Sequence, residues 1–146
     1  MNTYPVKPHQ GIGPVRLGMT RTESQQAMGR KPDSFQKGPE GTPLTDAYFE
    51  AAFQVFFDDR DVVEYIELSG PSPEFAALYR GKDVHRTVAR EVAELMSKDG
   101  AYDPDDPELG WSYLFPSLEL SLWRPGADDP FFATIGIGRE GYFSQA

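Results

Sequence analysis

The chain has 146 residues, 39% hydrophobic and 13% aromatic, and this composition favours one folded globular domain over residues 1–146 rather than a disordered chain. It has no cysteine, which excludes disulfide bonds, thiolate metal sites and thiol nucleophiles. The net charge of −9, from 23 acidic and 14 basic residues, argues against a nucleic-acid partner. The same charge permits a basic protein partner, and it is also what simple solubility requires.

The N-terminal sequence MNTYPVKPHQ lacks the charged and apolar regions of a signal peptide. No apolar run approaches the ~18–20 residues that a membrane helix needs. We therefore expect a cytoplasmic chain without membrane contact, with a mature form whose leader was removed as the alternative.

Residues 1–10 are expected to form an extended arm, because Pro5 and Pro8 disfavour a helix. A glycine-rich turn at 11–14 then leads into a brief strand at Val15–Leu17. The turn lacks the third glycine and the Gly-Lys-Ser/Thr ending of nucleotide-binding loops, so it predicts no such site.

The first predicted helix runs from Thr20 to Met28. Thr20 and Glu23 have the spacing of a capping box, and Gly29 suits the left-handed position after a helix. The side chains expected to face the core are Met19, Ala27 and Met28, whereas Ser24, Gln25 and Gln26 are expected to contribute little.

Residues 30–43 hold three prolines and two glycines, and they predict a loop without regular structure. Alternation of apolar side chains then predicts three strands, at Asp46–Phe49, Ala52–Phe57 and Val62–Leu68. The last two form a hairpin around the polar turn 58–61, with Phe53, Val55 and Phe57 on one face.

The second half repeats this order. A strand is expected at Phe75–Tyr79 and a helix from about Val84 to Lys98, with an apolar stripe of Val88, Val92, Leu95 and Met96. After an acidic loop at 99–110, three strands are expected at Trp111–Phe115, Leu118–Trp123 and Phe131–Ile137.

These elements predict an α+β fold: an antiparallel meander sheet with two helices packed on one face, and a possible two-unit pseudo-repeat. The other face of the sheet is then partly exposed. Aromatic residues on it would form a binding surface, and the candidates are Tyr65, Trp123 and Phe132.

The opening pattern G-x-G-P-V-x-L-G-M-T-x-x-E, from Gly11 to Glu23, resembles a group of small bacterial α+β proteins. It is similar to the helix-leading segment of SmpA/OmlA-type outer-membrane assembly lipoproteins and of the β-lactamase-inhibitor-protein-like fold. The sequence departs from this pattern at Ser24, and it has no lipoprotein cysteine, which argues against a membrane-assembly role. The resemblance implies a binding protein, since such groups include inhibitors and immunity proteins. It carries over no functional residue.

No catalytic, cofactor or metal constellation stands out. Asp103 and Asp105 have the start of a calcium-loop pattern, but the glycine and glutamate of an EF-hand are missing, and the other acidic turns at 58–61 and 128–129 are read as solvated. Two histidines, His9 and His85, are too few for a zinc site. We therefore expect no metal, no cofactor and no enzymatic activity.

The sequence thus favours a non-enzymatic binding protein, an immunity or inhibitor protein that blocks a toxin or enzyme through an acidic surface. The predicted contact residues are Asp103, Asp105, Asp106, Glu108 and Trp111. The alternative is a small-molecule-binding or enzymatic domain with a pocket between the sheet and the 30–43 loop. A third possibility is an assembly module that dimerises through a sheet edge.

Overall fold

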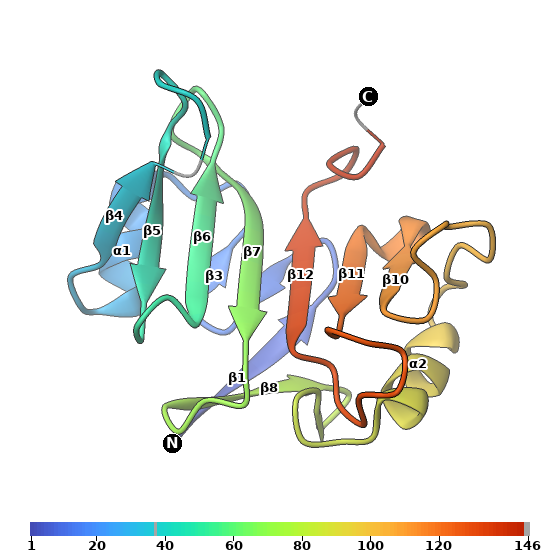
Figure 1. Cartoon of the computed structure of the whole chain (residues 1–146). Coiled ribbons are helices and arrows are strands. Elements are labelled where there is room, and N and C mark those ends of the chain that lie inside the picture. The colour runs from blue at the N-terminus through green and yellow to red at the C-terminus, as the bar shows by residue number, and fades with distance from the viewer. Residues whose placement is uncertain (37, 145–146) are drawn as a thin grey trace.

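The computed structural model describes residues 1–36 and 38–144, and it has an α+β fold with two sheets and two helices (Figure 1). A seven-stranded antiparallel sheet has the order β10-β11-β12-β7-β6-β5-β4, and a five-stranded mixed sheet has the order β3-β2-β1-β8-β9. The predicted α+β class with antiparallel pairing is confirmed. The relation of the two halves as repeats of one unit stays a prediction.

The strands and helices have the following bounds. The seven-stranded sheet contains β4 (Asp33–Gln36), β5 (Leu44–Tyr48), β6 (Phe53–Phe57), β7 (Val63–Ser69), β10 (Ser112–Phe115), β11 (Leu120–Trp123) and β12 (Thr134–Gly138). The five-stranded sheet contains β1 (Asn2–Lys7), β2 (Gly11–Ile12), β3 (Val15–Arg16), β8 (Phe75–Tyr79) and β9 (Lys82–Asp83). The helices are α1 (Arg21–Met28) and α2 (Ala89–Ser97), and a 3-10 turn spans Pro116–Leu118.

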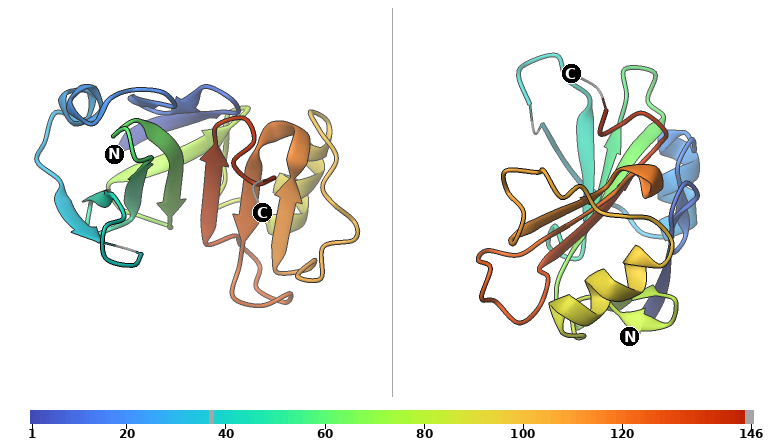
Figure 2. Two further views of the ribbon diagram at one scale, coloured as in Figure 1. Left: turned by 90° about the horizontal axis from the view of Figure 1, so that it is seen from above. Right: turned by 90° about the vertical axis from the view of Figure 1, so that its right-hand side faces the viewer.

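The core lies between the two sheets. Alternation places Phe53, Val55 and Phe57 of β6 inward, and all three are buried, as the sequence predicts. The ring of Phe53 meets two rings of the five-stranded sheet, at 5.5 Å from Tyr4 and 6.2 Å from Phe75. Figure 2 shows both helices and the five-stranded sheet on one side of the seven-stranded sheet. The loop at 124–131 projects on the opposite side (Figure 2).

The extended segment at 1–10 contains β1, which pairs in parallel with β8 and antiparallel with β2. Pro5 lies opposite Leu78, and its carbonyl accepts a hydrogen bond from the N–H of Gly13 at 3.0 Å. The residues expected to form an arm are therefore part of the second layer of the fold.

The start of α1 forms as predicted. The Thr20 hydroxyl accepts from the Glu23 N–H at 3.1 Å, and the Glu23 carboxylate accepts from the Thr20 N–H at 2.9 Å. The predicted inward face is confirmed for Met19 and Met28, which pack against the core, and wrong for two other residues, because Ala27 is exposed and Ser24 is buried. Ser24 and Met28 are four residues apart and so share the face that packs on the core.

Two further expectations are corrected. The segment 30–43 contains β4, because its prolines at 32, 39 and 43 all lie outside the four residues that pair with β5. The second helix begins at Ala89 rather than Val84. The Asp83 carboxylate accepts the backbone N–H groups of His85 and Arg86, which turns the chain before the helix and leaves Val88 half exposed.

A buried histidine predicts a pH dependence of stability. The His85 ring is 1% exposed, its Nε2 lies 3.3 Å from the Leu68 carbonyl oxygen, and its Nδ1 has no partner among the described residues. Burial lowers the pKa of His85, and it outweighs the opposing effects of the Leu68 carbonyl and Asp83.

Below about pH 6.5, the pKa of histidine in the unfolded chain, His85 is protonated in the unfolded state but remains neutral in the folded state. The free energy of unfolding therefore falls as the pH decreases. The expected loss is at most about 1.4 kcal/mol per pH unit, and it is absent above about pH 7.5. Urea unfolding of wild type and His85→Gln between about pH 5.5 and 7.5 measures it. An equal pH slope in both proteins would show that His85 is not the group that titrates.

Candidate binding surface

The acidic loop lies along the free edge of β10. The N–H of Asp103 donates to the carbonyl of Leu114 at 2.8 Å, and the Tyr102 ring packs on Tyr113 and Phe115 at 5.3 and 5.9 Å. The loop therefore covers the sheet edge and has a defined position there.

The four predicted acidic contacts divide into two pairs. The Asp103 and Asp106 carboxylates accept the backbone N–H groups two residues ahead, both at 2.9 Å, and so shape the turns. Asp105 and Glu108 are exposed. These two carboxylates are the ones that the loop presents to solvent.

Trp111 is one of several exposed apolar side chains at this end of the molecule. Among the described residues six large hydrophobic side chains are exposed, and four of them lie at this end of the molecule: Val88, Trp111, Trp123 and Phe131. Backbone hydrogen bonds and a β-bridge join the segments that carry them. The Trp111 carbonyl accepts from Arg124, the Trp123 carbonyl accepts from Ala133, and Val88 bridges Phe131.

Arg124 joins the two loops at this end of the molecule. Its guanidinium donates to the Gly110 carbonyl at 2.8 Å and to the Asp129 carbonyl at 2.7 Å, and it lies over the Phe132 ring. The side chain of Arg124 thus joins the 103–110 loop to the 124–131 loop. We call the surface formed by both loops, Trp111 and Trp123 the acidic end.

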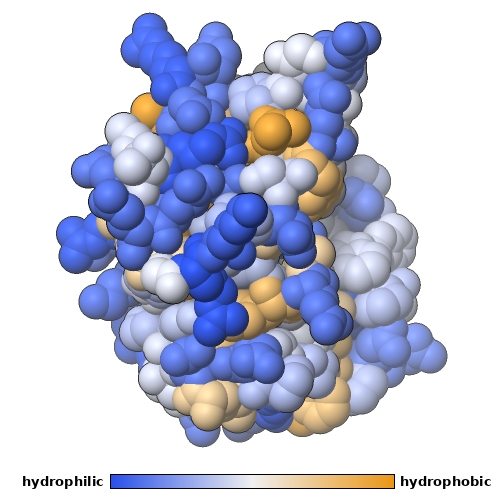
Figure 3. Space-filling model, turned by 90° about the vertical axis from the view of Figure 1, so that its left-hand side faces the viewer, coloured by the Kyte–Doolittle hydropathy of each residue, from blue (hydrophilic) through white to orange (hydrophobic). Residues whose placement is uncertain are grey.

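The acidic end carries most of the net charge of the protein. Its two loops hold one basic residue and six acidic residues, a net charge of −5 out of −9; the acids are Asp103, Asp105, Asp106, Glu108, Asp128 and Asp129. The one base, Arg124, is already bonded to the loop carbonyls. Figure 1 shows both loops beside β10 and β11. The side with α1 and β4 is mainly hydrophilic with scattered apolar residues (Figure 3).

The open face of the seven-stranded sheet is partly covered by the C-terminal segment. The Tyr65 ring stacks on Tyr142 at 4.7 Å, and the Glu119 carboxylate accepts the N–H groups of Gly141 and Phe143 at 3.0 and 3.1 Å. Phe132, which we expected on this face, is 1% exposed and belongs to the core. β12 begins only at Thr134, so strand parity does not extend back to Phe132.

Gly136 allows Tyr65 to lie flat on this face, since a Cβ there would be 1.9 Å from the Tyr65 hydroxyl oxygen. We expect Gly136→Ala to cost about 1–3 kcal/mol by overpacking, measured by denaturant unfolding. Tyr65→Ala in the same chain removes the collision, so the double variant is expected to show a favourable coupling energy. Additive effects of the two substitutions would contradict this placement of the ring.

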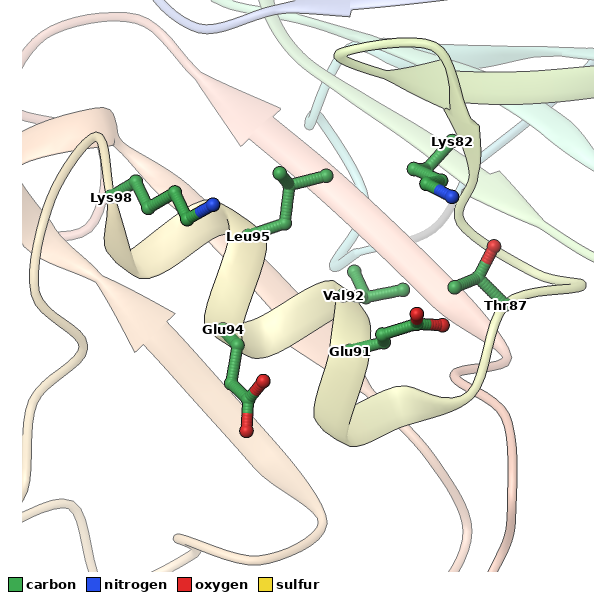
Figure 4. A pocket seen from close by; sticks show the side chains of 7 residues that line it. All are labelled: Lys82, Thr87, Glu91, Val92, Glu94, Leu95 and Lys98. Atoms are coloured by element: carbon green, nitrogen blue, oxygen red, sulfur yellow. The ribbon is translucent and has the colours of Figure 1, made fainter.

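Several hollows lie on the molecule, and one of about 390 Å³ adjoins the acidic end, where Tyr102, Tyr113 and Arg124 line it together with residues of α2. Figure 4 shows another on α2, about 200 Å³ in volume, with Lys82 and Lys98 at its two ends and Val92 and Leu95 between them. This volume is below the ~300–1,000 Å³ of typical ligand pockets. A third hollow of about 260 Å³ includes Arg30 of the 30–43 segment together with Phe49.

No group of three or more potential metal ligands occurs within residues 1–36 and 38–144. In the same residues no helix is long and apolar enough to span a membrane. Comparison with protein-family models, curated proteins and solved structures finds no match to this chain.

Two members of the acidic end, Phe131 and Asp128, were not predicted as site residues. They are distant in sequence from the 103–110 loop, and strand pairing and Arg124 join their loop to it. Val88, which pairs with Phe131, lies next to the acidic end. The available signal was the second acidic pair, Asp128 and Asp129, next to the exposed Trp123.

Proposed function

We propose that this protein is a non-enzymatic binding protein, an immunity or inhibitor protein that blocks a basic toxin or enzyme through its acidic end. The proposed setting is the bacterial cytoplasm. The observation that carries the proposal is the presence of four exposed apolar side chains on, or paired with, the segments that hold a local net charge of −5.

The two properties have different roles in binding. Aromatic side chains supply most of the affinity of typical protein interfaces when they enter pockets on the partner. Charged residues around them steer the encounter and exclude partners of the same sign. Trp111 and Trp123 suit the first role, and Asp105, Glu108 and Asp128 suit the second.

The test compares two triple variants with the same change in charge. Asp105→Asn, Glu108→Gln and Asp128→Asn remove three of the six negative charges of the acidic end and keep the carboxylates that shape its turns. Glu40→Gln, Glu50→Gln and Asp59→Asn remove the same charge from exposed acids elsewhere. Each protein is immobilised and exposed to lysate of the source organism at low and high salt, with bound proteins identified by mass spectrometry.

We expect a basic protein that wild type and the control variant retain at low salt, that the acidic-end variant loses, and that high salt releases. Its purified activity is expected to fall when wild type is added. If no retained protein distinguishes the two triple variants, the acidic end is not the binding surface.

A further inference from the structure

The five-stranded sheet is the basic layer of this acidic protein. Residues 1–22 contain no acidic residue, and they contribute Lys7, Arg16 and Arg21. Arg21 is paired with Asp46 and Asp61, whereas Lys7 and Arg16 are exposed and form no ion pair within the described residues.

Strand register brings these two free cations together. Gly11 of β2 pairs with Lys7 of β1 on one side and with Arg16 of β3 on the other. With strands about 4.8 Å apart, the Cα atoms of Lys7 and Arg16 are about 10 Å apart, within reach of one ligand for two long side chains. Directly paired residues point to the same face, which is the face opposite the buried Val6 and Val15.

Gly11 is required for this arrangement. A Cβ at position 11 would lie 2.2 Å from the Val15 carbonyl oxygen and 2.9 Å from the Arg16 Cα. The absence of a side chain therefore allows β3 to fold closely over β2 and carries Arg16 toward Lys7.

Two adjoining hollows lie at these residues. The smaller, of about 70 Å³, is lined by Lys7, Gln10 and Arg16 together with Gly11, Gly13 and Pro5. It exceeds the ~10–15 Å³ that a single water needs, so it can admit a small oxyanion. The larger, of about 420 Å³, shares Pro5, Lys7 and Gln10 and continues over the apolar side chains of Pro8 and Leu78.

The charge at the far end of the larger hollow is already balanced. Its one carboxylate, Asp99, accepts two hydrogen bonds from Arg80, at 2.5 and 2.8 Å, and one from the Tyr79 hydroxyl. The unbalanced charge of the groove is therefore the pair of cations at the small hollow, and the larger hollow offers mainly apolar contact.

We propose that this groove binds an organic phosphomonoester, with its phosphate between Lys7 and Arg16 and its apolar part over Pro5, Pro8 and Leu78. Two cations match the charge of a phosphate dianion, and Gln10 supplies a further donor. None of the residues that line the groove belongs to the acidic end, so the inference does not rest on the proposed function.

The test titrates the whole chain with phenyl phosphate, inorganic phosphate and benzoate, followed by calorimetry and by the amide resonances of Gly11 and Gly13. We expect phenyl phosphate to bind about tenfold more tightly than either inorganic phosphate or benzoate. Lys7→Gln with Arg16→Gln is expected to weaken phenyl phosphate binding by at least about tenfold.

The matched control is Lys82→Gln with Lys98→Gln, which removes the same charge from two exposed lysines of the α2 hollow. It is expected to leave the affinity unchanged, and urea unfolding checks that both double variants fold. If both double variants bind phenyl phosphate equally more weakly than wild type does, binding depends only on the net charge of the protein, and the proposal is overturned. Equal affinity for benzoate, or no binding of phenyl phosphate, would overturn it as well.

Discussion

Replacing Arg21 with methionine is expected to cost about 3–5 kcal/mol of folding free energy, because it leaves a buried carboxylate without its cation. The Asp46 side chain is fully buried, and Arg21 binds it at 2.8 Å. The same guanidinium pairs with Asp61 at 2.8 Å, donates to the Leu44 carbonyl, and lies 3.9 Å above the Phe57 ring. Arg21 thus fastens the first turn of α1 to β5 and β6.

The remaining donors to Asp46 are Gln25 at 3.0 Å and Ser34 at 2.8 Å, and both are neutral. They satisfy lone pairs but do not balance the charge, so the desolvation penalty of Asp46 stays uncompensated. Substituting both Arg21→Met and Asp46→Leu is expected to restore much of the loss.

Denaturant unfolding measures these differences. Arg90→Met is the control, because Arg90 is 86% exposed and its ion pair with Glu94 spans 3.9 Å. It is expected to change stability by less than about 0.5 kcal/mol. A loss below about 1 kcal/mol for Arg21→Met would show that Asp46 does not depend on this arginine.

The Arg21–Asp46 pair marks the limit of what the sequence predicts. Contacts over short distances along the chain were predictable: Thr20 and Glu23 form the capping box, and the alternation in β6 identifies its buried face. Asp46 was read as part of a strand, but its burial depends on Arg21 and Gln25 of α1. Composition and periodicity do not predict ion pairs and hydrogen bonds between residues that are far apart in the sequence.

The errors at the helix and strand ends have a similar origin. Val88 fits an apolar stripe of α2 by spacing, yet it precedes the helix because Asp83 turns the chain and Val88 bridges Phe131. Likewise the Glu119 carboxylate holds the C-terminal segment over the sheet, although Glu119 reads in the sequence as an outward strand residue.

The candidate site was predictable only in part. Its acidity and Trp111 follow from one continuous stretch of sequence. Its extent depends on the β10–β11 hairpin, which sets Ser112 opposite Trp123, and on Arg124, which joins Gly110 to Asp129.

Replacing Trp123 with alanine is expected to weaken binding of the captured partner by about 2 kcal/mol or more, a loss of about 30-fold in affinity. Trp123 ends β11 between Ser112 and Thr134, and its side chain is 42% exposed in the free protein. When a pocket on the partner covers the Trp123 side chain, a large apolar surface is removed from water. Because Trp123 is held by a rigid strand, little conformational entropy is lost on binding.

Equilibrium titration of the purified partner with wild type and Trp123→Ala measures this effect. Leu44→Ala is the matched control, because Leu44 is a large apolar residue of similar exposure, 48%, on β5. It is expected to bind as wild type does. Equal affinity of Trp123→Ala and wild type would show that Trp123 does not contribute to the interface.

Hydrogen exchange of this chain, free and bound to the captured partner, tests the position of the interface most directly. We predict slowed exchange of the backbone amides of the 103–110 and 124–131 loops and of Trp111 and Trp123, with β1–β3 and β4 unchanged. Slowed exchange confined to the α1 and β4 side, with the acidic end unchanged, would contradict the account.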